Sequence, residues 1–211
     1  MDMISGLRKS AVALAAGAGL FLAASQAQAV IVWSGVVNLA IPTTTNGLYV
    51  NVLNGANNLP GSTGGATVPG WDINPWGTPG LGFFNPTTPA GGVYVTSALA
   101  TVANLAVNTS ISGASTFGAG ATANAAQWTL NSSSNYFGFR FLNEGGGTVH
   151  YGWARLAIGA TVADRTLVSY AFESSPLTAI QAGVVPEPST YAMMGLGLAG
   201  LLFAVRRRKQ A

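Results

Sequence analysis

The 211-residue chain contains no cysteine, and only 7% of its residues are charged. It therefore cannot form a disulfide, a cysteine zinc site or a cysteine-bound iron–sulfur cluster, and it has no thiol nucleophile. Its stability must come from an apolar core or from a partner.

Lysine is absent between the two ends of the chain. The formal net charge is +3, but six of the nine basic residues lie in the terminal segments. Residues 30–185 keep three arginines and four carboxylates, which gives a net charge of −1 (3 − 4). Such a surface has no basic patch that would attract nucleic acid or anionic lipid, so neither is an expected partner.

The first 29 residues have the features of a secretory signal peptide. Two basic residues precede an apolar run over residues 11–24, and the small residues Ala27 and Ala29 mark a cleavage site. Cleavage after Ala29 by signal peptidase would make Val30 the first mature residue.

The last 26 residues have three parts. Pro186, Glu187 and Pro188 form an extended break, because proline lacks a backbone donor and disfavours helix in the residue before it. The apolar run over residues 191–205 predicts a single helix about 22 Å long, against roughly 30 Å of bilayer hydrocarbon. A terminal basic cluster then resists translocation and stays in the cytoplasm. It comprises Arg206, Arg207, Arg208 and Lys209.

This order of PEP motif, apolar segment and arginine cluster resembles the PEP-CTERM sorting signal of Gram-negative bacteria. The resemblance implies that the tail, residues 186–211, holds the precursor in the inner membrane until exosortase cuts near the PEP motif. A permanent C-terminal anchor is the alternative, although the apolar run is short for one.

Residues 30–185 predict one all-β domain, an antiparallel sandwich of jelly-roll type. Between Tyr136 and Leu142, phenylalanines alternate with Gly138 and Arg140, which is typical of a strand with one buried face. A turn at 143–147 separates this strand from its expected partner. Further strands are expected over residues 30–38, 48–53, 93–97, 148–158 and 166–172, and twice within 71–84.

The same region carries a second resemblance. Gly138–Phe141 (GFRF), His150–Trp153 (HYGW) and Tyr170–Glu173 (YAFE) are similar to a module that recurs in exported PEP-CTERM proteins. The resemblance implies export and a β fold, and it brings no catalytic reaction with it.

Few residues are available for catalysis. His150 is the only histidine, and no G-x-S-x-G motif exposes a serine for a triad. Asp72 and Glu173 are the best carboxylate pair for a glycan hydrolase, which needs two acids across a cleft. No acidic loop motif predicts a metal site. We therefore expect a protein that is not an enzyme and uses no cofactor, with a secreted glycan hydrolase as a remote alternative.

The segment WDINPW is the best candidate for a ligand site. Trp71 and Trp76 flank Asp72 and Asn74 in an expected loop, and an exposed aromatic ring beside polar side chains suits a sugar ring. Tryptophan is usually a core residue, however, so burial is the preferred interpretation, most strongly for Trp153.

Three charged residues interrupt otherwise apolar strands, where an unpaired charge would be costly. We therefore expect Glu173 to form an ion pair with Arg140 or Arg155.

Together these features predict an exported, non-catalytic protein of the cell surface or extracellular matrix, with a membrane-anchored precursor. Signal peptidase and exosortase are the expected processing partners. Association with exopolysaccharide in a biofilm follows from the family resemblance alone. A carbohydrate-binding module that uses the Trp71 and Trp76 loop is the alternative.

Overall fold

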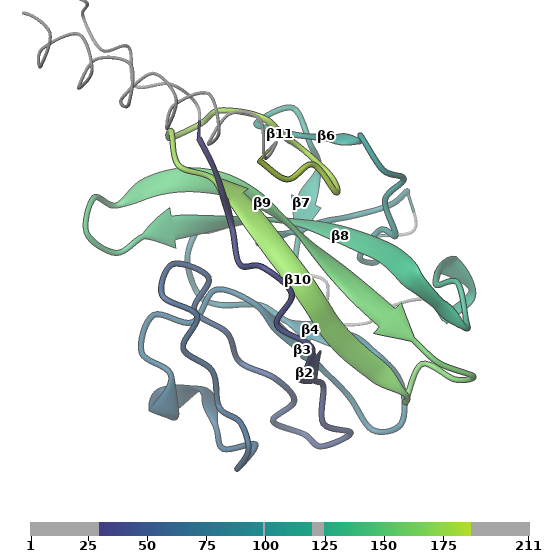
Figure 1. Cartoon of the computed structure of the whole chain (residues 1–211). Coiled ribbons are helices and arrows are strands. Elements are labelled where there is room, and N and C mark those ends of the chain that lie inside the picture. The colour runs from purple at the N-terminus through teal and green to yellow at the C-terminus, as the bar shows by residue number, and fades with distance from the viewer. Residues whose placement is uncertain (1–29, 99, 120–124, 187–211) are drawn as a thin grey trace, which may run out of the picture.

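The computed structural model describes residues 30–98, 100–119 and 125–186 (Figure 1). The expected signal peptide and the apolar C-terminal helix lie outside these residues, as do all the predicted sorting residues except Pro186. Within the described part of the chain, no helix has the length and apolar character of a membrane span.

Three long antiparallel strands form the centre of the fold: β8 (Ser132–Asn143), β9 (Thr148–Ile158) and β10 (Arg165–Glu173). They belong to a seven-stranded sheet in the order β1-β10-β9-β8-β5-β7, in which β2 also pairs with β10. All its pairings are antiparallel, so the predicted all-β antiparallel class is confirmed. The shorter strands are β1 (Ile31–Trp33), β2 (Leu39–Ala40), β5 (Tyr94–Val95) and β7 (Phe117–Gly118).

The prediction that β8 has one buried face is wrong, because both faces of the central sheet are covered. Phe137, Phe139 and Phe141 are fully buried on the first face. On the second face, a Cβ added to Gly138 would meet Val95 Cγ2 at 2.7 Å and Ile111 at 3.0 Å. Small residues on that face therefore lie beneath a covering layer and not in solvent.

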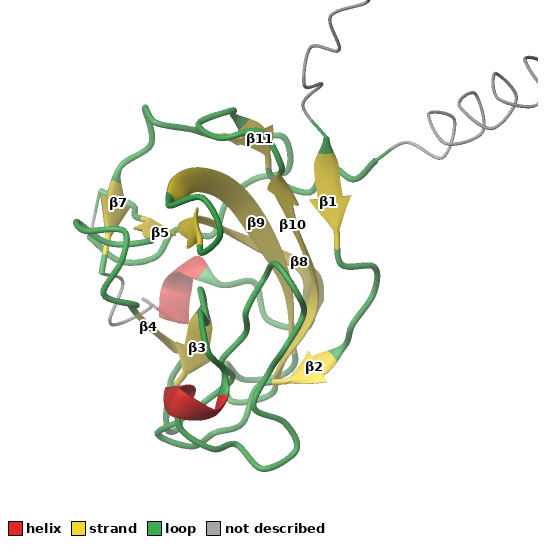
Figure 2. Ribbon diagram, turned by 90° about the vertical axis from the view of Figure 1, so that its left-hand side faces the viewer, coloured by secondary structure: helices red, strands yellow, loops and turns green. Residues whose placement is uncertain are grey.

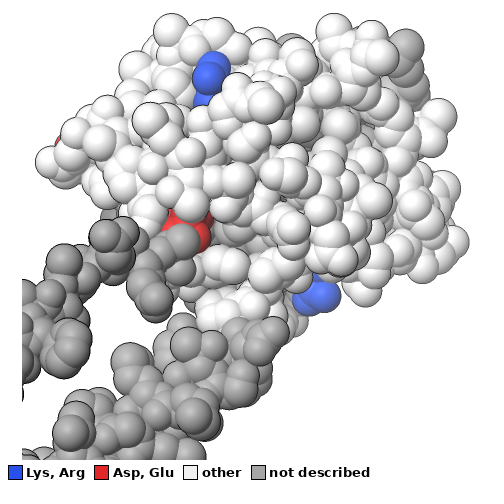
Figure 3. Space-filling view, turned by 90° about the horizontal axis from the view of Figure 1, so that it is seen from above, with Lys and Arg blue, Asp and Glu red and all other residues white. Residues whose placement is uncertain are grey.

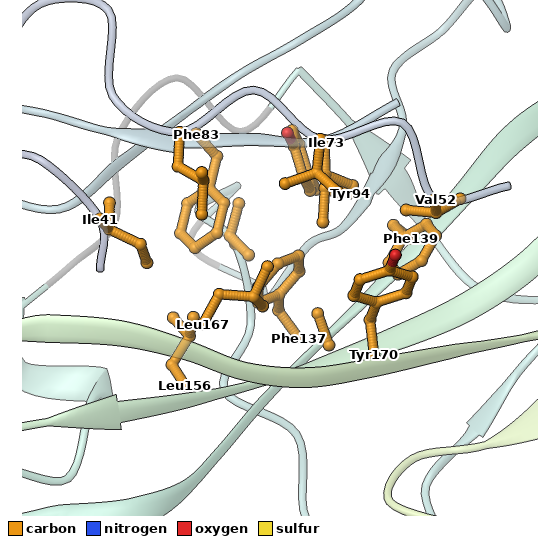
Figure 4. Close-up of a cluster of buried hydrophobic side chains, with 14 of the residues drawn as sticks. Ile41, Val52, Ile73, Phe83, Tyr94, Phe137, Phe139, Leu156, Leu167 and Tyr170 are labelled. Carbon is orange, nitrogen blue, oxygen red and sulfur yellow. The ribbon is translucent and has the colours of Figure 1, made fainter. Parts of the chain in front are cut away.

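The first face is covered by residues 41–84, which include β3 (Asn74–Trp76), β4 (Gly82–Phe84) and the 3-10 helix η1 (Gly65–Thr67). Figure 4 shows Ile73 and Phe83 from this layer facing Phe137 and Leu167 from the sheet. Phe83 packs with its ring centroid 4.9 Å from that of Phe137. This aromatic core is the larger of the two hydrophobic clusters.

The second face is covered by a two-stranded sheet of β6 (Ser110–Ile111) and β11 (Ile180–Gln181). Trp153 lies beneath it, 1% exposed, and its Nε1–H donates to the carbonyl oxygen of Val184 at 3.1 Å. The preferred interpretation of Trp153 as a core residue is confirmed. The segment that leads into the PEP motif is thereby bonded to the sheet. A second 3-10 helix, η2 (Ala125–Gln127), precedes β8.

The guanidinium of Arg165 fastens three loops together. It donates to carbonyl oxygens of five residues: Pro42, Gly77, Pro79, Gly80 and Val162. Burial lowers the pKa of Arg165 to about 10, so the group stays charged at neutral pH.

The two ends of the described chain leave the domain close together, as both ribbon views show (Figures 1 and 2). The layer that contains β3, β4 and η1 lies in the opposite half of the molecule. On the part of the face around the chain ends that the described residues form, the charged side chains in view are isolated from one another (Figure 3).

Candidate functional site

Four aromatic rings gather on the outer surface of the layer that covers the first face. We call this group, Tyr49, Trp71, Trp76 and Phe84, the aromatic platform. Phe84 is 50% exposed and the other three are half-buried. A pocket of about 300 Å³ lies between Tyr49, Trp76 and Phe84, with Thr45 and Asn46 at its polar side.

The rings support each other by direct contact. Trp71 stacks on Phe84 with a centroid distance of 5.8 Å and an interplanar angle of 23°. Tyr49 meets Trp71 edge-on at 4.8 Å and 77°. Both geometries are favourable for aromatic pairs, so the platform is organised before any ligand arrives.

Local sequence explains why these rings face outward. The amide nitrogens of Leu48 and Val50 donate to the carbonyls of Pro75 and Ile73, both at 3.0 Å, which aligns residues 48–50 with β3. Leu48 and Val50 point into the core, so Tyr49 between them points out.

Two glycines let the backbone approach the rings. Gly47 has φ +60°, and a Cβ there would collide with Trp76. At Gly65 a Cβ would lie 2.7 Å from the ring of Tyr49 and 2.8 Å from Nε1 of Trp71. Neither position accepts a larger side chain without displacing the platform.

Tyr94 connects the platform to the central sheet. Its hydroxyl accepts from the amide of Asn74 at 2.8 Å and donates to the carbonyl of Phe84 at 2.9 Å. Burial raises the pKa of Tyr94 above its ordinary value, so the hydroxyl keeps its proton at neutral pH. The buried side chain of Tyr94 thus positions both β3 and β4, the strands that carry Trp76 and Phe84.

The polar members of the predicted loop have other roles. Asn74 is 1% exposed, and its Nδ2 donates to the carbonyl of Asn46 at 2.8 Å. Asp72 is 6% exposed, and its Oδ2 accepts from the amide of Val52 at 2.8 Å. Both brace the layer from within, and neither lines the pocket between the rings.

Asp72 also lines a neighbouring pocket of about 280 Å³ with Trp71, Asn143 and Glu144. Burial raises the pKa of Asp72 to about 7, with a smaller contribution from the carboxylate of Glu144 and an opposing one from the Val52 amide. This carboxyl group therefore changes its charge near neutral pH.

The structure does not bring together the proposed hydrolase pair. Along β10, Ala171 belongs to the second-face cluster and Phe172 to the first. By alternation Glu173 points toward the second face, whereas Asp72 belongs to the layer on the first. The sheet separates the two carboxylates, so the pairing of Asp72 with Glu173 is wrong.

The expected ion pair of Glu173 is also wrong for the residues that the structure describes. Its Oε1 accepts the amides of Val30 and Ser175, each at 2.9 Å. Arg140 instead donates to the carbonyls of Gly92 and Ala90 at 2.8 and 2.9 Å. Both side chains thus hydrogen-bond to neutral backbone groups and not to each other.

Arg140 also lies over the ring of Phe117, 4.5 Å from its centroid. Arg155 forms no ion pair with Glu173 either, and its Nε is buried without a hydrogen-bond partner.

Three residues of this region were missed by sequence reasoning. Phe84 follows a buried residue in β4, and Tyr49 lies between two buried residues in an extended segment, so alternation could have placed both outside. Glu144 lies in the β8–β9 turn, and its place beside Asp72 depends on tertiary contacts alone.

The comparisons with known proteins bear on the end of the chain. The family profile that matches is the PEP-CTERM protein-sorting motif, over residues 184–209. The chain therefore carries the sorting motif of exported proteins that exosortase processes, and the sequence-based recognition of this signal is confirmed. The motif implies a membrane-anchored precursor that is cleaved for the cell surface. No curated protein and no solved structure matches the chain significantly.

Proposed function

We propose that the mature protein is a non-catalytic component of the cell surface or extracellular matrix that binds polysaccharide on the aromatic platform. The observation that carries this proposal is the outward cluster of four rings with amide and hydroxyl groups at its edge. Contiguous exposed apolar groups on a protein surface usually mark an interaction site.

A sugar ring matches this arrangement in two ways. Its C–H groups can pack on Trp76 and Phe84, and its hydroxyls can bond to Asn46 and Thr45 in the same pocket. Trp71 supports Phe84 by stacking on it. Residues 30–185 contain no lysine and have a net charge of −1 (3 − 4), so a polymer with few charges fits better than a polyanion.

A binding role without catalysis is supported by the state of the histidine. His150 is 3% exposed, its Nδ1 lies 2.8 Å from the carbonyl oxygen of Glu173, and its Nε2 lies 3.0 Å from Oγ1 of Thr148. Both ring nitrogens are engaged within the sheet, away from the platform. The sorting motif supports export and processing by exosortase, and association with an exopolysaccharide matrix is part of the proposal.

The test measures binding of the processed protein to polysaccharides, on a glycan array and to matrix polysaccharide from the producing cells. We expect Trp71→Ala and Phe84→Ala each to weaken binding roughly tenfold, which corresponds to about 1.4 kcal/mol per lost ring contact. Trp33→Ala is the matched control, because Trp33 is an exposed tryptophan (41%) outside the platform. Binding that survives both platform substitutions, or that falls equally in the control, would contradict the proposal.

A further inference from the structure

Glu173 is a buried carboxylate at the end of β10, only 2% exposed. Its Oε1 receives the backbone N–H of Val30 at 2.9 Å, and the amide of Ser174 donates to the carbonyl of Val30 at 3.0 Å. Ile31 is paired with Glu173 in the register of β1 and β10. Residues 173 and 174 therefore hold Val30 on both sides, where β1 forms the edge of the sheet (Figure 1).

No cation accompanies this carboxylate among the residues that the structure describes. Arg140 and Arg165 donate to backbone carbonyls elsewhere, and His150 contacts the backbone carbonyl of Glu173 and not its side chain. An ionised carboxylate that is buried without a counter-charge is costly. The carboxylate thus accepts two backbone hydrogen bonds through Oε1 and has no counter-charge among the described residues.

The sequence places the expected signal-peptidase cut directly before this position. Hydrolysis of the Ala29–Val30 bond adds one water: Ala29 keeps the hydroxyl oxygen as a carboxylate, and Val30 becomes an α-ammonium after proton transfer. The nitrogen that now donates at 2.9 Å would then carry a positive charge.

We propose that removal of the signal peptide supplies the missing cation, so that the new N-terminus of Val30 forms a partly buried ion pair with Glu173. The pair latches β1 to the edge of the sheet in the mature protein. Charge-assisted hydrogen bonds are shorter and stronger than neutral ones, so the latch is tighter after cleavage than before. It does not depend on any ligand at the platform.

The ion pair can form only if signal peptidase cuts the bond between Ala29 and Val30. Each extra residue in an extended chain displaces the ammonium by about 3.4 Å, beyond contact with the carboxylate. A protein with one additional N-terminal residue would keep the neutral hydrogen bond of Val30 and lose the ion pair.

The first test uses the absence of lysine between the chain ends. In the protein processed at both ends, the α-amino group of Val30 is the only amine, so an acylating reagent reports on it alone. Only the unprotonated amine reacts, and pairing with Glu173 keeps it protonated. At pH 7.5 we expect acylation to be about tenfold slower than in Glu173→Gln, the change that corresponds to one pKa unit.

The measurement is mass spectrometry of the N-terminal peptide after timed labelling, with Glu144→Gln as an isosteric control at an exposed carboxylate. In urea all three proteins should react alike. Equal rates in the native wild type and Glu173→Gln, or a processed N-terminus other than Val30, would overturn the proposal.

The second test inserts one alanine between Ala29 and Val30. The exported protein should then unfold several degrees lower than the wild type, and the same insertion in Glu173→Gln should have no further effect. An insertion that lowers the melting temperature equally in both backgrounds acts through packing and not through the ion pair, which would count against the latch.

Discussion

The two faces of the central sheet are covered in different ways. Residues 41–84 cover the first face with few regular strands, held in place by buried polar side chains such as Tyr94 and Arg165. A short two-stranded sheet covers the second, and the side chain of Trp153 donates to the carbonyl of Val184 just after it. The thicker cover carries the aromatic platform, and the thinner one lies against the segment that leads into the sorting motif.

This difference would place the proposed binding and the processing of the chain ends on different faces of the sheet. A cover built from loops can present aromatic side chains outward because its own fold depends on a few buried hydrogen bonds. A cover beside the chain ends needs only to hold the terminal segments. Substitutions on the two faces should therefore differ in cost and in what they impair.

The largest difference in the free energy of unfolding should be between a substitution of Arg165 and one of Arg140. Arg165→Met removes the donor shared by carbonyls of three loops, so we expect the free energy of unfolding to fall by about 3 kcal/mol or more. Arg140→Met removes two bonds at a partly exposed site and should cost about 1 kcal/mol. Urea unfolding of the processed protein measures both. Equal losses would show that the first-face cover does not depend on Arg165.

A matched pair of glycines compares packing on the two faces. At Gly152 a Cβ would press on the ring of Phe139 and lie 2.8 Å from the backbone oxygen of Ala171. At Gly138 it would meet only side-chain ends of Val95 and Ile111, which can move. We expect Gly152→Ala to cost about 3 kcal/mol and Gly138→Ala about 1 kcal/mol. Thermal unfolding that ranks them in reverse would contradict the view that the second cover is the more yielding.

The free energy of unfolding should depend on pH through the titration of Asp72. Burial raises its pKa from 3.8 to about 7, so the folded state binds the proton more tightly than the unfolded state. Its favourable contribution is full below about pH 4 and is lost as the pH rises through about 7. From pH 5 to pH 8 the wild type should lose on the order of 2 kcal/mol relative to Asp72→Asn. Parallel stability curves for the two proteins would show that Asp72 is not the group responsible.

The smallest loss of stability should come from removing the Tyr94 hydroxyl, which joins the platform to the central sheet. Tyr94→Phe removes one acceptor and one donor and should cost about 1 to 2 kcal/mol. Because the bonds hold Asn74 and Phe84, glycan binding should weaken too. Tyr136→Phe, on the second face, should leave binding unchanged. Binding that is intact in Tyr94→Phe would mean that the rings hold their own arrangement.

The strand β8 could be predicted from the sequence because its phenylalanines alternate with Gly138 and Arg140. The same alternation led to the wrong prediction that the other face of β8 is exposed to solvent. Gly138 offers no apolar side chain, and Arg140 suggests solvent, although a second layer lies over this side of the sheet. Pattern alone reports what a side chain is and not what covers it.

The candidate site was predictable only in part. Trp71 and Trp76 stand out in the sequence, whereas their partners Tyr49 and Phe84 join them through pairings with β3. The role of Arg165 required five carbonyls from separated loops, which no local pattern contains. Glu173 was expected to find an arginine, and only the register of β1 showed the N-terminal partner.

The distance between the chain ends and the layer of β3 and β4 affects how the precursor is displayed. If the platform binds polysaccharide as proposed, its place in the half opposite the chain ends would leave it accessible while the tail tethers the precursor. Binding and cutting would then use opposite ends of the domain, and cleavage would release the protein together with any polymer already bound.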